Sequence, residues 1–94
     1  MGDIRLSGQL LCATEEESRR VREHLPEHTR LTRAEPGCVA FEVAPTESPL
    51  TWSVEERFES RDDFDAHQER VQSSEWGRAT AGIERRYVVD ELDR

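Results

Sequence analysis

The feature that most constrains the fold is a pair of segments, RAEPGCVAFEVAP and WSVEERFESRDDFDAH, which begin at Arg33 and Trp52. The first segment is typical of a helix end, a tight turn and a strand. Pro36 cannot continue a helix, and Gly37 reaches backbone angles that other residues avoid. Apolar side chains then alternate along the strand, at Val39, Phe41 and Val43.

The second segment predicts a strand, a helix cap and a helix. Apolar residues at even spacing mark the strand, at Trp52, Val54 and Phe58. Ser60 is placed to cap the following helix, with Asp63 at the capping-box position. Phe64, His67 and Val71 then follow at helical spacing. The two segments therefore predict two strands flanked by two helices.

The rest of the chain completes this pattern. Residues 4–13 alternate as a strand, and Thr14 with Glu17 forms a capping box that starts a helix. Pro26 predicts either a kink in this helix or a break, with a second short helix from about Pro26 to Ala34. The second main helix is expected over 61–74, with a further turn over 78–82. Residues 85–91 alternate again and predict the last strand.

The order β-α-β-β-α-β predicts an α+β, ferredoxin-like fold with an antiparallel sheet, formed by residues 1–94 as a single domain. Helices then cover one face of the sheet only. We expect the other face to carry large apolar groups such as Trp52 or Phe41, depending on the strand parity, and a second copy of the chain to cover it. The predicted assembly is a homodimer.

Three motifs resemble the antibiotic biosynthesis monooxygenase family, which includes small quinol monooxygenase-like proteins. They are EPGC at 35–38 before an alternating strand, ERFES at 56–60, and Ala66-His67 on the following helix. The resemblance implies the same element order and a barrel-like homodimer, a dimeric α/β-barrel, with a pocket between sheet and helices in each subunit. It also implies a catalytic role for His67. The family's haem-degrading branch uses a pocket asparagine, which this chain lacks.

Composition excludes several classes of function. The formal net charge is −8 and all 13 basic residues are arginine, so we expect no nucleic acid and no anionic membrane as partner. No apolar stretch approaches the roughly 20 residues that a bilayer-spanning helix needs. Cys12 and Cys38 lack CxxC spacing and no secretory segment precedes them, which favours reduced thiols and a cytoplasmic location.

Two histidines are candidates for chemistry, since imidazole titrates near neutrality. His67 interrupts the apolar stripe of the second helix. It is a general base, a partly buried structural histidine held by a hydrogen bond, or one that pairs with Asp63, one turn earlier. His28 follows the Pro26 position and is either presented to a pocket or exposed on a charged segment. No histidine spacing indicates a metal, and we expect no metal and no cofactor.

Glu56 lies on the apolar face of its strand, where an unpaired carboxylate is costly. Either it forms a structural ion pair with an arginine on a neighbouring strand such as Arg86, or it is a site acid. Trp52, Phe41 and Trp76 are either walls of an aromatic pocket or ordinary core residues.

The hypothesis that joins these residues is a cofactor-independent monooxygenase acting on a quinol-like or polyphenolic substrate. A deprotonated, electron-rich phenol can itself reduce oxygen, so the protein needs a base, an anion-stabilising group and a dry aromatic pocket. His67 is the expected base and Arg86 the expected anion stabiliser. Two alternatives stay open: a non-catalytic dimeric module that binds a small apolar or aromatic ligand or a partner protein, and an isomerase or tautomerase that uses the same base.

Overall fold

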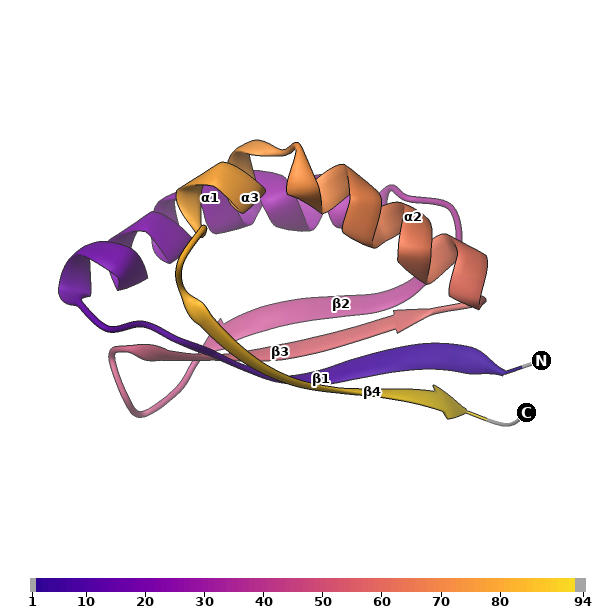
Figure 1. The fold of residues 1–94 in the computed structure, drawn as a ribbon, viewed down its shortest axis with the longest axis horizontal. Helices are drawn as coiled ribbons and strands as arrows, with labels where there is room; N and C mark the ends of the chain where they lie inside the picture. Colours follow the sequence, from indigo (N-terminus) through magenta and orange to yellow (C-terminus); the bar gives the residue numbers. More distant parts are fainter. Residues whose placement is uncertain (1, 93–94) are drawn as a thin grey trace.

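The computed structural model describes residues 2–92 as a four-stranded antiparallel sheet with three helices packed on one face (Figure 1). The elements in chain order are β1 (Asp3–Leu11), α1 (Glu15–Arg33), β2 (Cys38–Pro45), β3 (Thr51–Phe58), α2 (Arg61–Gln72), α3 (Glu75–Ala79) and β4 (Glu84–Leu92). The strand order in the sheet is β2-β3-β1-β4. This is the predicted ferredoxin-like fold, with α3 as an additional short helix after α2.

Both main helices begin where the capping signals place them. Thr14 Oγ1 accepts a hydrogen bond from the Glu17 amide at 3.2 Å, and Glu17 Oε1 accepts one from the Ala13 amide at 2.7 Å. At α2, Ser60 Oγ accepts from the Asp63 amide at 3.1 Å. These bonds satisfy backbone donors that a helix start leaves unpaired. Asp63 therefore serves the helix cap and does not pair with His67.

Pro26 lies inside α1 without ending it, because the helix runs unbroken from Glu15 to Arg33. The predicted break and separate short helix do not occur. Proline lacks the amide hydrogen needed for one helical bond, but burial of the apolar face of α1 against the sheet offsets that loss. The consequence for the site is that His28 and Thr32, both buried, share one continuous helix with Val21.

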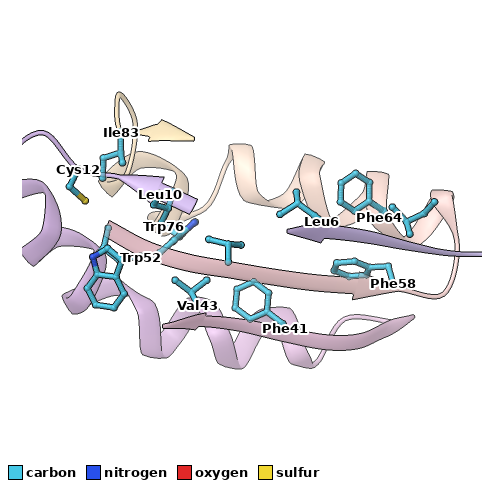
Figure 2. Packing of buried hydrophobic residues seen from close by; sticks show 13 residues of the cluster. Leu6, Leu10, Cys12, Phe41, Val43, Trp52, Phe58, Phe64, Trp76 and Ile83 are labelled. Carbon is cyan, nitrogen blue, oxygen red and sulfur yellow. The ribbon is translucent and has the colours of Figure 1, made fainter. Parts of the chain in front are cut away.

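The core lies between the helices and the inner face of the sheet. It includes Phe41 of β2 and Trp52, Val54 and Phe58 of β3, all at most 5% exposed. Figure 2 shows these strand side chains together with Phe64 and Trp76 from the helical layer. Trp52 and Phe41 thus both face the helices, which corrects the expectation that one of them lies on the uncovered face.

The strand β2 departs from strict alternation at its start. The register against β3 shifts between Cys38 and Ala40, and Val39 is 50% exposed instead of sharing the buried face of Phe41. An irregularity of this kind turns one side chain away from its expected face. Just before it, Gly37 has a φ of 79°, and a Cβ there would lie 2.1 Å from Asp63 Oδ2. The turn therefore requires glycine, as predicted.

The uncovered face of the sheet is mainly polar and small. Its residues include Ser7 and Gln9 of β1, Ala40 and Glu42 of β2, Ser53 and Glu55 of β3, and Arg86 and Val88 of β4. Arg5 and Glu55 form an ion pair at 3.5 Å across this face. Among residues 2–92, no helix combines the length and apolar character needed to cross a membrane.

Candidate active site

The centre of the site is His67 of α2, which lies between two carboxylates. Its side chain is 2% exposed. Nδ1 lies 2.7 Å from Glu35 Oε1, and Nε2 lies 3.5 Å from Glu56 Oε1. The imidazole is thus held on one side by a hydrogen bond and faces a second negative charge on the other. Such a chain of carboxylate, imidazole and carboxylate can store and transfer a proton.

Glu35 reaches His67 from the turn after α1, and it is itself fixed by Arg70. The Arg70 Nε atom donates to Glu35 Oε2 at 2.6 Å, and its Nη2 atom donates to Thr32 Oγ1 at 3.1 Å. His67 and Arg70 are three residues apart on α2, so they lie on the same side of that helix. Because both oxygens of Glu35 are engaged, its carboxylate has a fixed orientation toward His67.

The protonation of His67 follows from these contacts. Burial acts to lower its pKa, but the Glu56 and Glu35 carboxylates outweigh burial, so the pKa of His67 is raised above its usual value. The imidazolium form of His67 therefore persists to a higher pH than that of a free imidazole, because it lies between two negative charges.

Glu56 has one oxygen without a hydrogen-bond partner. The residue is 7% exposed and lies on β3 between Val54 and Phe58, on the inner face where the sequence pattern places it. Its Oε1 atom is buried and makes no hydrogen bond within the described part of the chain, since the 3.5 Å approach of His67 Nε2 is an electrostatic contact. A buried carboxylate oxygen in this state is disposed to accept a hydrogen bond from a bound molecule.

His28 of α1 stacks on Trp76 of α3, with the ring centroids 4.4 Å apart and the planes 2° from parallel. His28 is 4% exposed, and its Nδ1 atom is buried without a hydrogen-bond partner in the described residues. Burial, and then the nearby charge of His67, lower the pKa of His28 to about 3. His28 is therefore a neutral, polar wall of the site.

These groups open on a cavity of about 400 Å³, called the inner pocket here. It lies between the helices and the β1–β4 side of the sheet, and its lining includes His28, Glu56, His67, Val71, Trp76, Arg85 and Tyr87. This volume is within the range of small-molecule sites. A second cavity of about 420 Å³, the outer cavity, lies beyond the same stack and is also lined by His28 and Trp76, together with His24 and Glu27.

Arg85 and Tyr87 bring the last strand into the inner pocket. The Arg85 guanidinium is held by the Thr80 and Ile83 carbonyl oxygens, at 3.1 and 3.0 Å from Nη1, and by Thr80 Oγ1 at 2.7 Å from Nη2. Burial raises the pKa of Tyr87 to about 12, with Arg85 acting in the opposite direction. Tyr87 therefore stays a neutral phenol, while Arg85 supplies a fixed positive charge.

Trp76 is positioned by the short helix α3. Ser74 Oγ accepts from the Gly77 amide at 3.0 Å and donates to the Val71 carbonyl oxygen at 2.8 Å. A Cβ on Gly77 would lie 2.1 Å from that same carbonyl. The absence of a side chain at Gly77 thus lets α3 pack closely on the end of α2 and brings Trp76 against His28.

The structure brings together four of the residues predicted for the site: His67, Glu56, His28 and Trp76. Phe41 lies behind them, with its ring centroid 5.2 Å from His28 and 6.3 Å from His67.

Two other predicted residues lie elsewhere. The Trp52 indole donates to Ser18 Oγ at 3.1 Å and lines a different groove, next to Pro26. Arg86 is on the uncovered sheet face, where its Nε atom binds Glu84 at 2.8 Å. The neighbour of Glu56 is thus His67 and not Arg86.

Sequence reasoning missed Glu35, Arg70, Arg85 and Tyr87 as site residues. Arg70 is three residues after His67 on one helix, a spacing that indicates a shared face. Arg85 is two residues before Tyr87 on one strand, so alternation places both on the inner face and Arg86 on the other. Glu35 begins the EPGC motif, but the motif did not name its partner, because the contact of Glu35 with His67 spans 32 residues of chain.

Metal binding has no clear location in this site. Among residues 2–92, no group of three or more His, Cys, Asp and Glu side chains has an arrangement suited to holding a metal ion.

Comparison with solved structures supports the fold over nearly the whole chain. A candidate antibiotic biosynthesis monooxygenase from Nitrosomonas europaea superposes with a TM-score of 0.80 at 18% identity, covering 98% of this chain and 92% of its own. A conserved protein from Methanosarcina mazei Go1 gives 0.77 at 16% identity, covering 99% and 95%. A candidate antibiotic biosynthesis monooxygenase from Caulobacter crescentus gives 0.73 at 17% identity, covering 99% and 90%.

Sequence comparison gives the family. Among curated proteins no significant match to the chain was found. The model of the antibiotic biosynthesis monooxygenase family, however, matches residues 9–79, a segment that runs from β1 through α3 and contains Glu35, Glu56 and His67. The chain therefore belongs to the antibiotic biosynthesis monooxygenase family.

Proposed function

We propose that this protein is a cofactor-independent monooxygenase that acts on a quinol-like or polyphenolic aromatic substrate. The observation that carries the proposal is the chain of Glu35, His67 and Glu56 at a pocket walled by Trp76, in which Glu56 Oε1 has no hydrogen-bond partner among the described residues. Membership of a family named for monooxygenases gives the reaction class. The geometry supplies the base and the aromatic wall that such a reaction needs.

The first step is removal of the phenolic proton by the Glu56–His67 pair. Glu56 Oε1 faces His67 Nε2 at 3.5 Å and is free to accept a hydrogen bond from the substrate hydroxyl. Since the pKa of His67 is raised, the pair keeps its proton to a higher pH than a free imidazole would. It gains full capacity as a base when that proton is lost, so turnover rises with pH through the pKa of His67.

The phenolate then reacts with oxygen at a ring carbon that bears hydrogen. A carbon–oxygen bond forms to give a hydroperoxide. The base next removes the hydrogen of that carbon, the oxygen–oxygen bond breaks and water leaves. One oxygen atom remains as a quinone carbonyl, the other becomes water, and the substrate supplies all four electrons. The reaction therefore balances as phenol plus oxygen to quinone plus water.

Arg85 is the group that stabilises the negative charge of the phenolate. Its guanidinium is fixed by three hydrogen bonds to Thr80 and Ile83 and lines the inner pocket. A charge held in place before the reaction stabilises a developing anion without reorganisation. Trp76, backed by the His28 ring, offers a flat surface on which an aromatic substrate can stack.

A second candidate is an isomerase or tautomerase. The same carboxylate and imidazole groups could move a proton within a substrate without using oxygen, and this part of the site has no feature reserved for oxygen. A non-catalytic ligand-binding module is the third possibility, in which Glu56 and His28 only bind. Oxygen consumption separates all three.

We also propose that the protein works as a homodimer in the cytoplasm. The uncovered face of the sheet carries short side chains such as Ser7, Ala40 and Ser53, which allow a second sheet to approach closely. Resemblance to the family, in which two such sheets form a barrel-like dimer, supports this arrangement.

The test is oxygen uptake by the purified protein with a panel of quinols and anthrones, before and after metal stripping. Uptake that survives stripping and yields one water per quinone supports the proposal. His67→Ala should lower turnover by about 10²-fold, while His24→Ala, on the outer-cavity side, should leave it unchanged. Uptake that stops after stripping would contradict the cofactor-free mechanism, and conversion without uptake would indicate the isomerase.

A further inference from the structure

Two buried polar atoms, on residues that line the inner pocket, lack hydrogen-bond partners within the described residues, and they come from opposite layers of the fold. Glu56 Oε1 belongs to β3 in the sheet, and His28 Nδ1 belongs to α1 in the helical layer. Both residues are more than nine-tenths buried, at 7% and 4% exposure. A buried polar atom without a hydrogen bond costs free energy. A ligand that forms hydrogen bonds with both atoms is therefore bound more tightly than a ligand that forms a hydrogen bond with only one of them.

The charged groups next to these two residues are already engaged. His67 Nδ1 binds Glu35, Arg70 binds Glu35 and Thr32, and Arg85 binds Thr80 and Ile83. Within the described residues these groups therefore have less need of a ligand than Glu56 Oε1 and His28 Nδ1. The two unpaired atoms are the ones that define which ligand fits.

The chemistry of these atoms selects the kind of substituent. Glu56 Oε1 is a carboxylate oxygen, so it requires a donor and disfavours a ligand carboxylate. His28 is neutral because burial lowers its pKa to about 3, so its Nδ1 is either a donor or an acceptor according to the tautomer. A hydroxyl can both donate and accept, and it satisfies His28 in either tautomer. Ammonium groups are disfavoured by the nearby cations Arg85, Arg70 and protonated His67.

We infer that His28 is a specificity-determining residue, which hydrogen-bonds through Nδ1 to a second hydroxyl of an aromatic ligand whose first hydroxyl is bound by Glu56. The inference rests on the proposed function for the location of the site. It goes beyond it by assigning the two hydroxyls of such a ligand to separate receptors, one on α1 and one on β3. The stacked Trp76 ring keeps the plane of His28 fixed, so that its Nδ1 atom has a defined direction.

The test is calorimetric binding without oxygen, so that ligands neither oxidise nor turn over. The probes are two dihydroxynaphthalenes, with adjacent or opposite hydroxyls on one ring, and α-naphthol, which keeps one hydroxyl. At least one diol should bind the wild-type protein about tenfold more tightly than α-naphthol. His28→Phe preserves an aromatic ring against Trp76 and should reduce this ratio to about one. His24→Phe, one turn earlier on α1, should preserve it.

Several outcomes would overturn the inference. Equal binding of α-naphthol and both diols to the wild type would mean that water satisfies His28 Nδ1, and a ratio retained in His28→Phe would remove His28 from recognition. Failure of every probe to bind would overturn it as well. If His28→Phe does not fold, two other measurements decide the question. One is the ratio of diol to α-naphthol affinity in the wild type. The other is the same ratio in His28→Gln, which keeps a polar group and should keep part of the preference.

Oxygen uptake by the same wild-type sample separates this inference from the proposed function. A diol preference without oxygen consumption supports the role of His28 and contradicts the oxygenase. Oxygen consumption without a diol preference supports the oxygenase and contradicts the role of His28.

Discussion

His67 Nδ1 and Glu35 Oε1 are 2.7 Å apart, although the two residues are separated by 32 positions in the chain and lie on different elements. The contact joins the turn after α1 to α2, and Arg70 fixes it from the other side of the carboxylate. It sets both the orientation and the charge of the central imidazole. Removing the negative charge of Glu35 is therefore the most direct way to change the proton affinity of the site.

Glu35→Gln should lower the pKa of His67, because one of the two carboxylates that stabilise the imidazolium is lost. The measurement is an NMR titration of the His67 ring protons in both proteins. Glu27→Gln, which changes an exposed carboxylate paired with Arg30, is the matched control and should leave the titration unchanged. An unchanged pKa in Glu35→Gln would mean that Glu56 alone holds the proton.

The buried state of His28 predicts a loss of stability in mild acid. Its pKa is about 3 in the folded protein and about 6.5 in the unfolded chain. The unfolded state therefore binds the extra proton first, and the free energy of unfolding should fall as pH decreases from about 6.5 toward 3, by up to about 1.4 kcal/mol per pH unit. Urea unfolding between neutral pH and pH values near 5 measures the slope, and His28→Phe should reduce it.

His67 contributes with the opposite sign. Its folded pKa is raised, so its stabilising contribution is fully present below about 6.5 and is lost as pH rises through the folded value. His28 thus lowers the free energy of unfolding on the acid side of the pH range, and loss of the His67 proton lowers it on the alkaline side. For His28, the assignment would be contradicted if the free energy of unfolding changed with pH by the same amount in acid for the wild type and for His28→Phe.

Glu56→Ala should lower the free energy of unfolding by about 1 kcal/mol or more, because it leaves the buried imidazolium of His67 with one carboxylate and creates a cavity. The sequence suggested Arg86 as the partner of Glu56, whereas the structure places His67 beside it. Glu55→Ala, next in the strand and exposed, is the control and should change stability by less than about 0.5 kcal/mol. Equal effects of the two substitutions would show that Glu56 is solvated in the folded protein.

Gly77→Ala should destabilise the protein by about 1 to 3 kcal/mol, since the added Cβ would lie 2.1 Å from the Val71 carbonyl oxygen. Relief of this overlap requires α3 to move away from α2, which carries Trp76 away from His28. Thermal unfolding and near-ultraviolet circular dichroism of the tryptophans measure both effects. A variant with wild-type stability would mean that α3 adjusts freely.

The homodimer proposal predicts a sedimenting mass of about twice the 10.9 kDa of one chain at micromolar concentration. Ser53→Arg places a long charged side chain on the uncovered sheet face and should shift the protein toward monomer. Glu16→Arg, on the exposed start of α1, alters charge away from that face and should leave the mass unchanged. A wild-type monomer would refute the proposal.

The sequence allowed the element order to be predicted because its signals are local. The Thr14 and Ser60 caps, the glycine turn at Gly37 and the alternation around Trp52 each act over a few residues, and each was found in the structure. Of the two outcomes expected at Pro26, a kink or a break, the break does not occur, because tertiary packing maintains α1 across a locally unfavourable residue. Local signals thus fail where burial of a whole helix outweighs one missing hydrogen bond.

The site was harder to predict from the sequence, because its contacts join residues that are far apart in the chain and depend on which face of its strand each side chain occupies. His67 and Glu56 could be singled out as polar residues on apolar faces. The choice between Arg85 and Arg86 needed the register of β4 against β1, where Arg85 is opposite Leu10 and Arg86 is opposite Gln9. The pairing of Glu35 with His67 needed the packing of the turn on α2, which no spacing in the sequence encodes.

The His28–Trp76 stack is a wall shared by the inner pocket and the outer cavity. Molecules on its two sides therefore contact the same pair of rings, and their binding free energies are coupled if either one displaces the stack. By thermodynamic reciprocity, a compound in the outer cavity that changes the affinity of the inner pocket by some factor has its own affinity changed by that same factor when the inner pocket fills. The two cavities then behave as one linked system.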